Sequence, residues 1–148
     1  MATTAQITLS SGDIAGDPVN VTKLATLTKA DSTNDLDQST GLNRVHLRST
    51  TQKTLLSAST TNRTPGDNKA GKVYLINKSD DASLYVTVSI NAQTIGKLYG
   101  GDFLFIPWSQ TDTDASIKVA ATNWTSSTGD IPIEYALFHE DQDFLTNA

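Results

Sequence analysis

Apolar and polar residues alternate most regularly in the second half of the chain. Between Leu84 and Ile90 every second residue is apolar, which places Leu84, Val86, Val88 and Ile90 on one face of an extended segment and Tyr85, Thr87 and Ser89 on the other. This spacing predicts a half-buried β-strand. Similar patterns predict further strands at Val73–Asn77, Thr94–Tyr99, Asp102–Trp108, Ser116–Thr122 and Ile131–His139. The polar stretch Lys78–Ser83 is suited to a hairpin loop between the first two strands of this half.

The first half of the chain has a weaker pattern. Short strands are predicted at Gln6–Leu9, Val19–Thr28, Leu42–Ser49 and Lys53–Ala58. The polar segment Lys29–Gly41 predicts a long loop, or an arm that a partner orders. No stretch sustains the spacing of an amphipathic helix, so almost no helix is expected.

Short strands at intervals of roughly 8–14 residues predict an all-β protein. The 22 threonines and 14 serines agree, because threonine is β-branched and neither residue is a strong helix former. We expect an antiparallel β-sandwich, jelly-roll-like, with an extended N-terminal arm. The expected organisation is an arm over residues 1–41, a sandwich domain over 42–140 and a C-terminal tail over 141–148. Deletion of residues 1–40 is expected to leave a folded sandwich that no longer assembles.

Charge and composition exclude several classes of partner. The net charge is −5, and the eleven basic residues are scattered, which argues against a phosphate-binding surface and direct nucleic-acid binding. The chain has no cysteine, and therefore no disulfide, thiolate metal site or cysteine nucleophile. No apolar run approaches a membrane span, and the first residues lack the features of a secretory signal. A protein made in cytoplasm, with no membrane partner, is expected.

The sequence offers little catalytic chemistry. His46 and His139 have no second ligand at a metal-type spacing, and the carboxylates are spread over predicted loops and the tail. We therefore expect no catalytic residue, no metal, no cofactor and no enzymatic activity. The segment Gly101–Trp108 resembles the G-D-x-x-x-x-P stretch of cupins, whose metal-binding histidines are absent here. That resemblance implies a turn entering a jelly-roll strand. A cupin-like enzyme is also the weakest of three functional hypotheses, of which the other two follow below.

Aromatic side chains are the strongest candidates for binding. Aromatic rings can stack on sugars, and they are also enriched in cores and at subunit interfaces. The residues expected to face an interface or a glycan are Tyr85, Tyr99, Trp108, Trp124 and Phe138.

The order of features from residue 71 to 140 carries a family resemblance. A strand with an Asn end (Lys72–Ser79) precedes a second strand (Leu84–Ile90) and the segment Ile95–Pro107, and the strands Ile117–Ala121 and Ile133–Phe138 follow. This order is similar to that of the small β-sandwich proteins of tailed-bacteriophage particles.

The resemblance implies a structural virion protein without enzymatic activity. The first hypothesis is a capsid decoration (cement) protein that binds the major capsid protein or other virion subunits as a homo-oligomer such as a trimer. The alternative is a tail, neck or fibre-associated adhesin that binds a host surface glycan through loops around Trp108 and Trp124.

Overall fold

The computed structural model describes residues 3–12, 19–28, 36, 38–57, 70–109 and 114–139. Their regular structure consists of β-strands, which confirms the all-β prediction. The described residues contain no helix that could cross a membrane. The strands are β1 (Thr4–Ser11), β2 (Val19–Thr26), β3 (Gln38–Ser39), β4 (Asn43–Leu47), β5 (Lys53–Ser57), β6 (Ala70–Asn77), β7 (Tyr85–Ile90), β8 (Gln93–Tyr99), β9 (Phe103–Ser109), β10 (Ser116–Ala120) and β11 (Ile131–His139).

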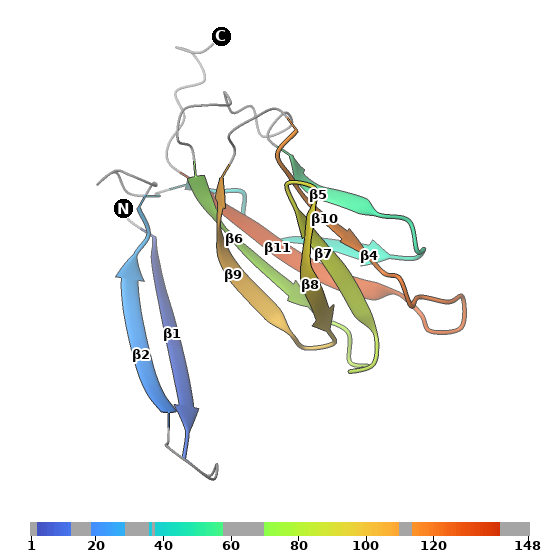
Figure 1. Cartoon of the computed structure of the whole chain (residues 1–148), viewed down its shortest axis with the longest axis horizontal. Helices are drawn as coiled ribbons and strands as arrows, with labels where there is room; N and C mark the ends of the chain where they lie inside the picture. The colour runs from blue at the N-terminus through green and yellow to red at the C-terminus, as the bar shows by residue number, and fades with distance from the viewer. Residues whose placement is uncertain are drawn as a thin grey trace.

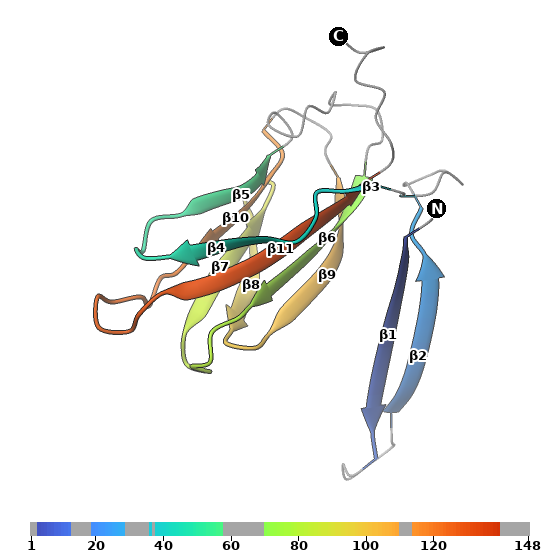
Figure 2. The same ribbon diagram turned by 180° about the vertical axis from the view of Figure 1, so that it is seen from behind.

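Strands β3 to β11 form two antiparallel sheets packed face to face (Figures 1 and 2). One sheet has the order β5-β10-β7-β8. The other has the order β3-β11-β6-β9, and β4 pairs with β11 beside β3. The predicted antiparallel β-sandwich is therefore confirmed.

The predicted strands correspond closely to the observed ones, with two differences. Strand β3 lies within the segment expected to be a loop, and it pairs with Phe138 and His139 at the end of β11. The expected hairpin between β6 and β7 is wrong, because these strands belong to different sheets. Residues Lys78–Ser83 instead carry the chain across the edge of the sandwich. The C-terminal tail 141–148 and most of 29–37 lie outside the described residues.

The alternation in β7 has the predicted register. Val86 and Val88 are almost completely buried, whereas Tyr85 and Thr87 on the opposite face are partly exposed. A β-bulge between Val88 and Ser89 shifts the pairing with β8. Because side chains of a strand alternate between its faces, this register places the two valines between the sheets.

The core between the sheets consists of two clusters. The larger is built around Val86, Val88, Leu75, Ile131 and Ile133, with Trp124 and Leu104 packed against it. The smaller contains Trp108, Val73, Ile117, Leu137, Leu56 and Ala115. Burial of apolar side chains from both inner faces is the main stabilising contribution in such a sandwich.

Three asparagines connect the loops at the ends of the sandwich. Asn77 is completely buried, and its side-chain amide donates to Leu84 O (3.2 Å) and Leu98 O (3.0 Å). The β7–β8 turn has positive φ at Asn91 (49°) and Ala92 (67°), as a type I′ hairpin turn requires. Asn123 donates to Ser83 O at 2.9 Å and accepts from the Tyr85 amide at 3.3 Å. The side chains of Asn77 and Asn123 thus provide hydrogen-bond partners for backbone groups near the ends of the strands.

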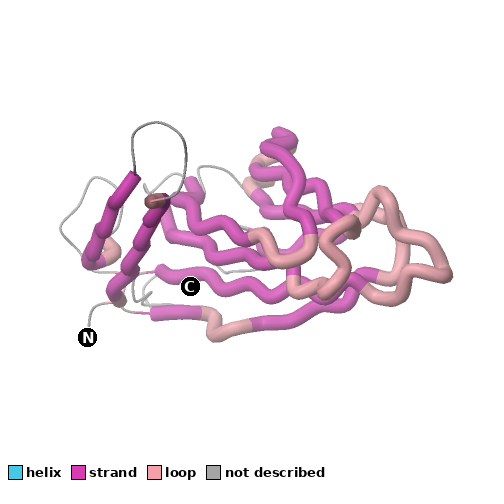
Figure 3. Tube along the Cα trace, turned by 90° about the horizontal axis from the view of Figure 1, so that it is seen from below, coloured by secondary structure: helices cyan, strands magenta, loops and turns pink. Residues whose placement is uncertain are grey.

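Strands β1 and β2 form a hairpin that stands outside the sandwich. They pair only with each other, from Thr4 opposite Thr26 to Ser11 opposite Val19. In the view from below (Figure 3) the two strands lie at one side of the sandwich, apart from its sheets. At the base, the Thr3 amide donates to Leu36 O at 3.2 Å, and the Leu36 amide donates to Leu27 O at 2.8 Å. We call the hairpin of β1 and β2 the arm.

Candidate functional site

Of the five aromatic candidates, Trp108 is a core residue, which corrects the expectation that it faces an interface or a glycan. Its side chain is completely buried in the smaller cluster. The indole Nε1 donates to Asn91 Oδ1 at 3.0 Å, so the polar atom of the ring has a partner inside the protein. The inward alternation of β9 and this hydrogen bond explain its position.

Trp124 forms a hydrogen bond within its own loop. The ring is partly buried against the larger core cluster, and Nε1 donates to Gly129 O at 2.8 Å across the loop between β10 and β11. This bond closes the loop on itself. Only part of the indole surface remains available for a ligand.

Tyr85 and Tyr99 form a pair on the outer face of the four-stranded sheet. Their ring centroids are 5.1 Å apart with an interplanar angle of 52°, and Lys97 Nζ lies 4.3 Å from the Tyr85 ring centroid. A hydrogen bond with the Thr122 side chain and the charge of Lys97 hold the pKa of Tyr85 below its usual value. The pair is a small aromatic surface with a cation and a hydroxyl beside it.

Phe138 lies on the outer face of the other sheet. Its ring centroid is 6.4 Å from that of Phe105 on β9, at an interplanar angle of 58°. Phe103 and Phe105 are exposed at 60% and 39%, and Tyr74 of β6 is directly opposite Phe105. We call Tyr74, Phe103, Phe105 and Phe138 the aromatic patch.

The arm has one apolar face. Residues opposite each other in an antiparallel pair share a face, and the register puts Ala5 and Ala25, Ile7 and Lys23, Leu9 and Val21, and Ser11 and Val19 on the same one. We call these eight residues the arm face. The other side is mostly polar, with Thr4, Gln6, Thr8 and Ser10 along β1.

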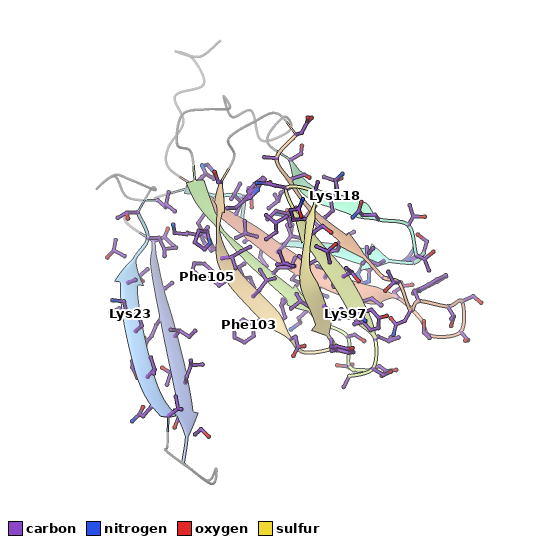
Figure 4. The ribbon with its side chains drawn as sticks, viewed as in Figure 1. Lys23, Lys97, Phe103, Phe105 and Lys118 are labelled. Carbon is purple, nitrogen blue, oxygen red and sulfur yellow. The ribbon has the colours of Figure 1, made fainter. Side chains whose placement is uncertain are left out.

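Part of the arm face and part of the aromatic patch line one groove of about 620 Å³. Ala5, Ile7, Lys23 and Ala25 come from the arm, and Tyr74 and Phe103–Ile106 come from the sandwich. Figure 4 shows Phe103 and Phe105 on β9, at the side of the sandwich nearest the arm that carries Lys23. The lining is predominantly apolar, which suits contact with another apolar surface.

Polar side chains gather at a different edge. Arg48 Nε lies 2.9 Å from Asp130 Oδ2, and His46 Nδ1 is 3.9 Å from the same oxygen. A shallow pocket of about 480 Å³ runs from His46 to Thr54 beside this cluster. Arg44 of β4 is hydrogen-bonded to Glu134 of β11 and lowers the pKa of that carboxyl. In the part of the chain that the structure describes, no three His, Asp or Glu side chains are grouped to hold a metal ion.

Comparison with known proteins identifies no family for this chain. No protein-family model matches the chain, and no curated protein matches its sequence. The most distinctive feature of the candidate site is the groove between the arm face and the aromatic patch.

Sequence reasoning missed the arm face, although the chain carries a signal for it. Ala5, Ile7 and Leu9 alternate with polar residues, as do Val19 and Val21. Gly12 and Pro18 near the ends of the intervening segment are turn formers that favour a hairpin. What the sequence could not supply is the place of this hairpin beside Phe103 and Phe105, which depends on tertiary structure.

Proposed function

We propose that the protein is a structural component of a tailed-phage virion, specifically a capsid decoration protein that binds the head shell through subunit contacts. The arm is the observation that carries the proposal. A two-stranded hairpin is marginally stable alone, yet here it exposes Ile7, Leu9, Val19 and Val21 at 45–50%. Such a surface is suited to a partner subunit, which would cover it.

We also propose that the sandwich is a jelly roll, the finer architecture expected from the sequence. Among β4 to β11, every connection except that between β7 and β8 passes from one sheet to the other. The resulting orders, β4-β11-β6-β9 and β5-β10-β7-β8, support two Greek keys of a double-sheet jelly roll. Viral capsid and lectin domains use this architecture, so it is compatible with both functional candidates and by analogy alone selects neither.

The proposed mechanism is mechanical. The rigid sandwich positions the arm, and the arm contacts the major capsid protein or another virion subunit. A specific contact buries roughly 1,200–2,000 Å², and symmetry repeats it over the shell. Many repeated contacts would then resist internal pressure without any chemical step. The protein would be made in the host cytoplasm and function in the virion.

The test is antibody labelling of virions produced from the genome that encodes the chain, viewed by electron microscopy. Regular label over the head is expected, whereas label confined to the tail would overturn the decoration role. Particles without label would overturn the virion assignment altogether.

A truncated chain that lacks residues 1–26 tests whether the arm is needed for binding to the same particles. The cut precedes Leu27, because Leu27 and Leu36 are buried and β3 pairs with β11. We expect the truncated chain to melt within a few degrees of the full chain and to be missing from the particles. Unfolding of the truncated chain would mean that the arm belongs to the folding unit.

The second candidate is an adhesin that binds a host surface glycan, and the Tyr85–Tyr99 pair favours it. Exposed rings stack on the apolar faces of sugars, while Lys97 and nearby hydroxyls could fix orientation. On a glycan array, Tyr99→Ala should weaken any binding at least tenfold, and Ile95→Ala on the same strand should leave it unchanged. Equal binding by wild type and Tyr99→Ala would remove the tyrosine pair from consideration.

A further inference from the structure

Two exposed apolar surfaces lie on the same side of the described structure. One is the arm face and the other is the aromatic patch, and the groove lies between Ile7 and Lys23 of the first and Phe103 and Phe105 of the second. The side chains of the arm appear in neither core cluster. Both surfaces therefore remain accessible in a single copy of the chain.

The aromatic patch is part of a regular grid on the outer face of the five-stranded sheet. Its rows run across β11, β6 and β9, and their members are Glu134, Ile76 and Phe103, then Ala136, Tyr74 and Phe105, then Phe138, Lys72 and Pro107. Seven of these nine side chains are apolar or aromatic. Stacked sheets pack about 10 Å apart with their side chains interdigitated, so this grid has the form of a sheet face that can receive another sheet.

The arm of the same chain does not fill that position. A groove of about 620 Å³ separates the arm from β9 and β6, and Phe103 is exposed at 60%. If the arm were packed on the patch as a third layer, these rings would be buried. The arm therefore stands beside its own patch without covering it.

The size of the two surfaces favours a second copy of the chain as the occupant. If two copies exchanged arms, each copy would bury its arm face and its aromatic patch at once, including Ile7, Leu9, Phe103 and Phe105, which are 39–60% exposed. A standard interface buries about 800 Å² on each partner, and a contact that uses both surfaces comes nearer to that size than a contact on one of them. An unrelated partner seated on only one surface would leave the other exposed.

The composition of the surfaces agrees with self-association. Lys23 is the one charged residue of the arm face, and a lysine can lay its aliphatic stem on apolar surface while its ammonium group stays in water. Glu134 in the first row of the grid is already paired with Arg44 of its own chain and is only 13% exposed, so the contact does not depend on it. Lys72 in the third row of the grid is the other cation of the two surfaces, and the remaining contact is between apolar and aromatic side chains.

We propose that copies of this chain associate by exchanging arms, with the arm face of each copy lying on the aromatic patch of its partner. This inference rests on the proposed function in giving the arm a binding role, and it names the partner at that surface. The isolated full-length chain is sufficient to test it.

Sedimentation of the purified full chain is the measurement, from low to high micromolar concentration. The wild type should associate, whereas Ile7→Asp on the arm face and Phe103→Asp on the patch should each associate at least tenfold more weakly. Both positions are exposed, so the variants should fold, and circular dichroism melts verify this. Leu24→Asp is the matched control, because Leu24 is 65% exposed on the opposite side of the arm, and it should associate like wild type.

An equimolar mixture of Ile7→Asp and Phe103→Asp distinguishes exchange from other contacts. Each mixed pair combines one intact arm with one intact patch, so the mixture should associate more tightly than either variant alone. Failure of the mixture to associate beyond the separate variants, or a monomeric wild type at every concentration, would overturn the exchange.

The outcomes separate this inference from the proposed function. A monomeric wild type that still decorates heads through an Ile7-dependent contact would refute the exchange and leave the decoration role intact. A dimer that exchanges arms but is missing from virions would support the exchange and refute the decoration role.

Discussion

Val86→Asp is expected to lower the free energy of unfolding by at least about 3–5 kcal/mol, the cost of an uncompensated buried charge. Domains of this kind are stable by about 5–15 kcal/mol in total, so the variant would lose a large fraction of its stability. Val86 is completely buried in the larger core cluster. In that position a carboxylate would have no cation among its cluster neighbours.

Thr87→Asp is the matched control one residue later. Thr87 is partly exposed on the outer face and pairs with Lys97 of β8. An aspartate there would lie opposite a cation, so we expect a loss below about 1 kcal/mol, set mainly by strand propensity. Urea denaturation of the two variants is the measurement. Similar losses in both would show that β7 is out of register by one residue.

Asn77→Ala is expected to lower the free energy of unfolding by about 3 kcal/mol or more. The Asn77 side chain donates to Leu84 O and Leu98 O and accepts from the Ser79 amide at 2.9 Å. Its removal leaves these backbone groups without a partner at a completely buried site, and each unsatisfied buried group costs about 1–3 kcal/mol. The main chain of Asn77 is also bonded to Asp102 O and the Gly101 amide, so the effect should spread to the β8–β9 turn.

Asn43→Ala provides the comparison for this prediction. The Asn43 side chain donates to Gly41 O at 3.2 Å in an exposed turn, where water can replace the lost bond. The Asn43→Ala variant should lose less than about 1 kcal/mol of its free energy of unfolding in the same denaturation experiment. Hydrogen exchange at the Ser79 amide should accelerate in Asn77→Ala and remain unchanged in Asn43→Ala. Equal stability of the two variants would contradict the assigned role of Asn77.

Alternation made the strands predictable, because a strand buried on one face repeats every two residues. The pattern placed Val86 and Val88 on the inner face, as the structure does. The pairing between strands was harder to predict from the sequence. Residues Lys78–Ser83 are polar whether the next strand pairs with β6 or crosses to the other sheet. Strand β7 belongs to the other sheet because it pairs with β8 and with the distant β10, and the local pattern does not reveal that pairing.

The candidate site was predictable only in part. Tyr85 and Tyr99 were recognised, and the structure places them together on the outer face of a sheet. Trp108 was misplaced because aromatic enrichment does not distinguish a core from an interface, whereas its position on the inward alternation of β9 does. The groove could not be read from sequence, since it depends on where the arm stands relative to Phe103 and Phe105.

The role of β11 at the centre of its sheet has a consequence for folding during synthesis. Arg44 and Glu134, which are bonded across β4 and β11, are 90 residues apart in the sequence, and β3, β4 and β6 all pair with this last strand. Long-range pairing of this kind makes folding slow, in milliseconds to seconds, whereas a local hairpin forms in about 1–10 μs. The arm can therefore form as soon as it leaves the ribosome, while the sandwich must wait for nearly the whole chain, and its unpaired strand edges remain open to aggregation until β11 emerges.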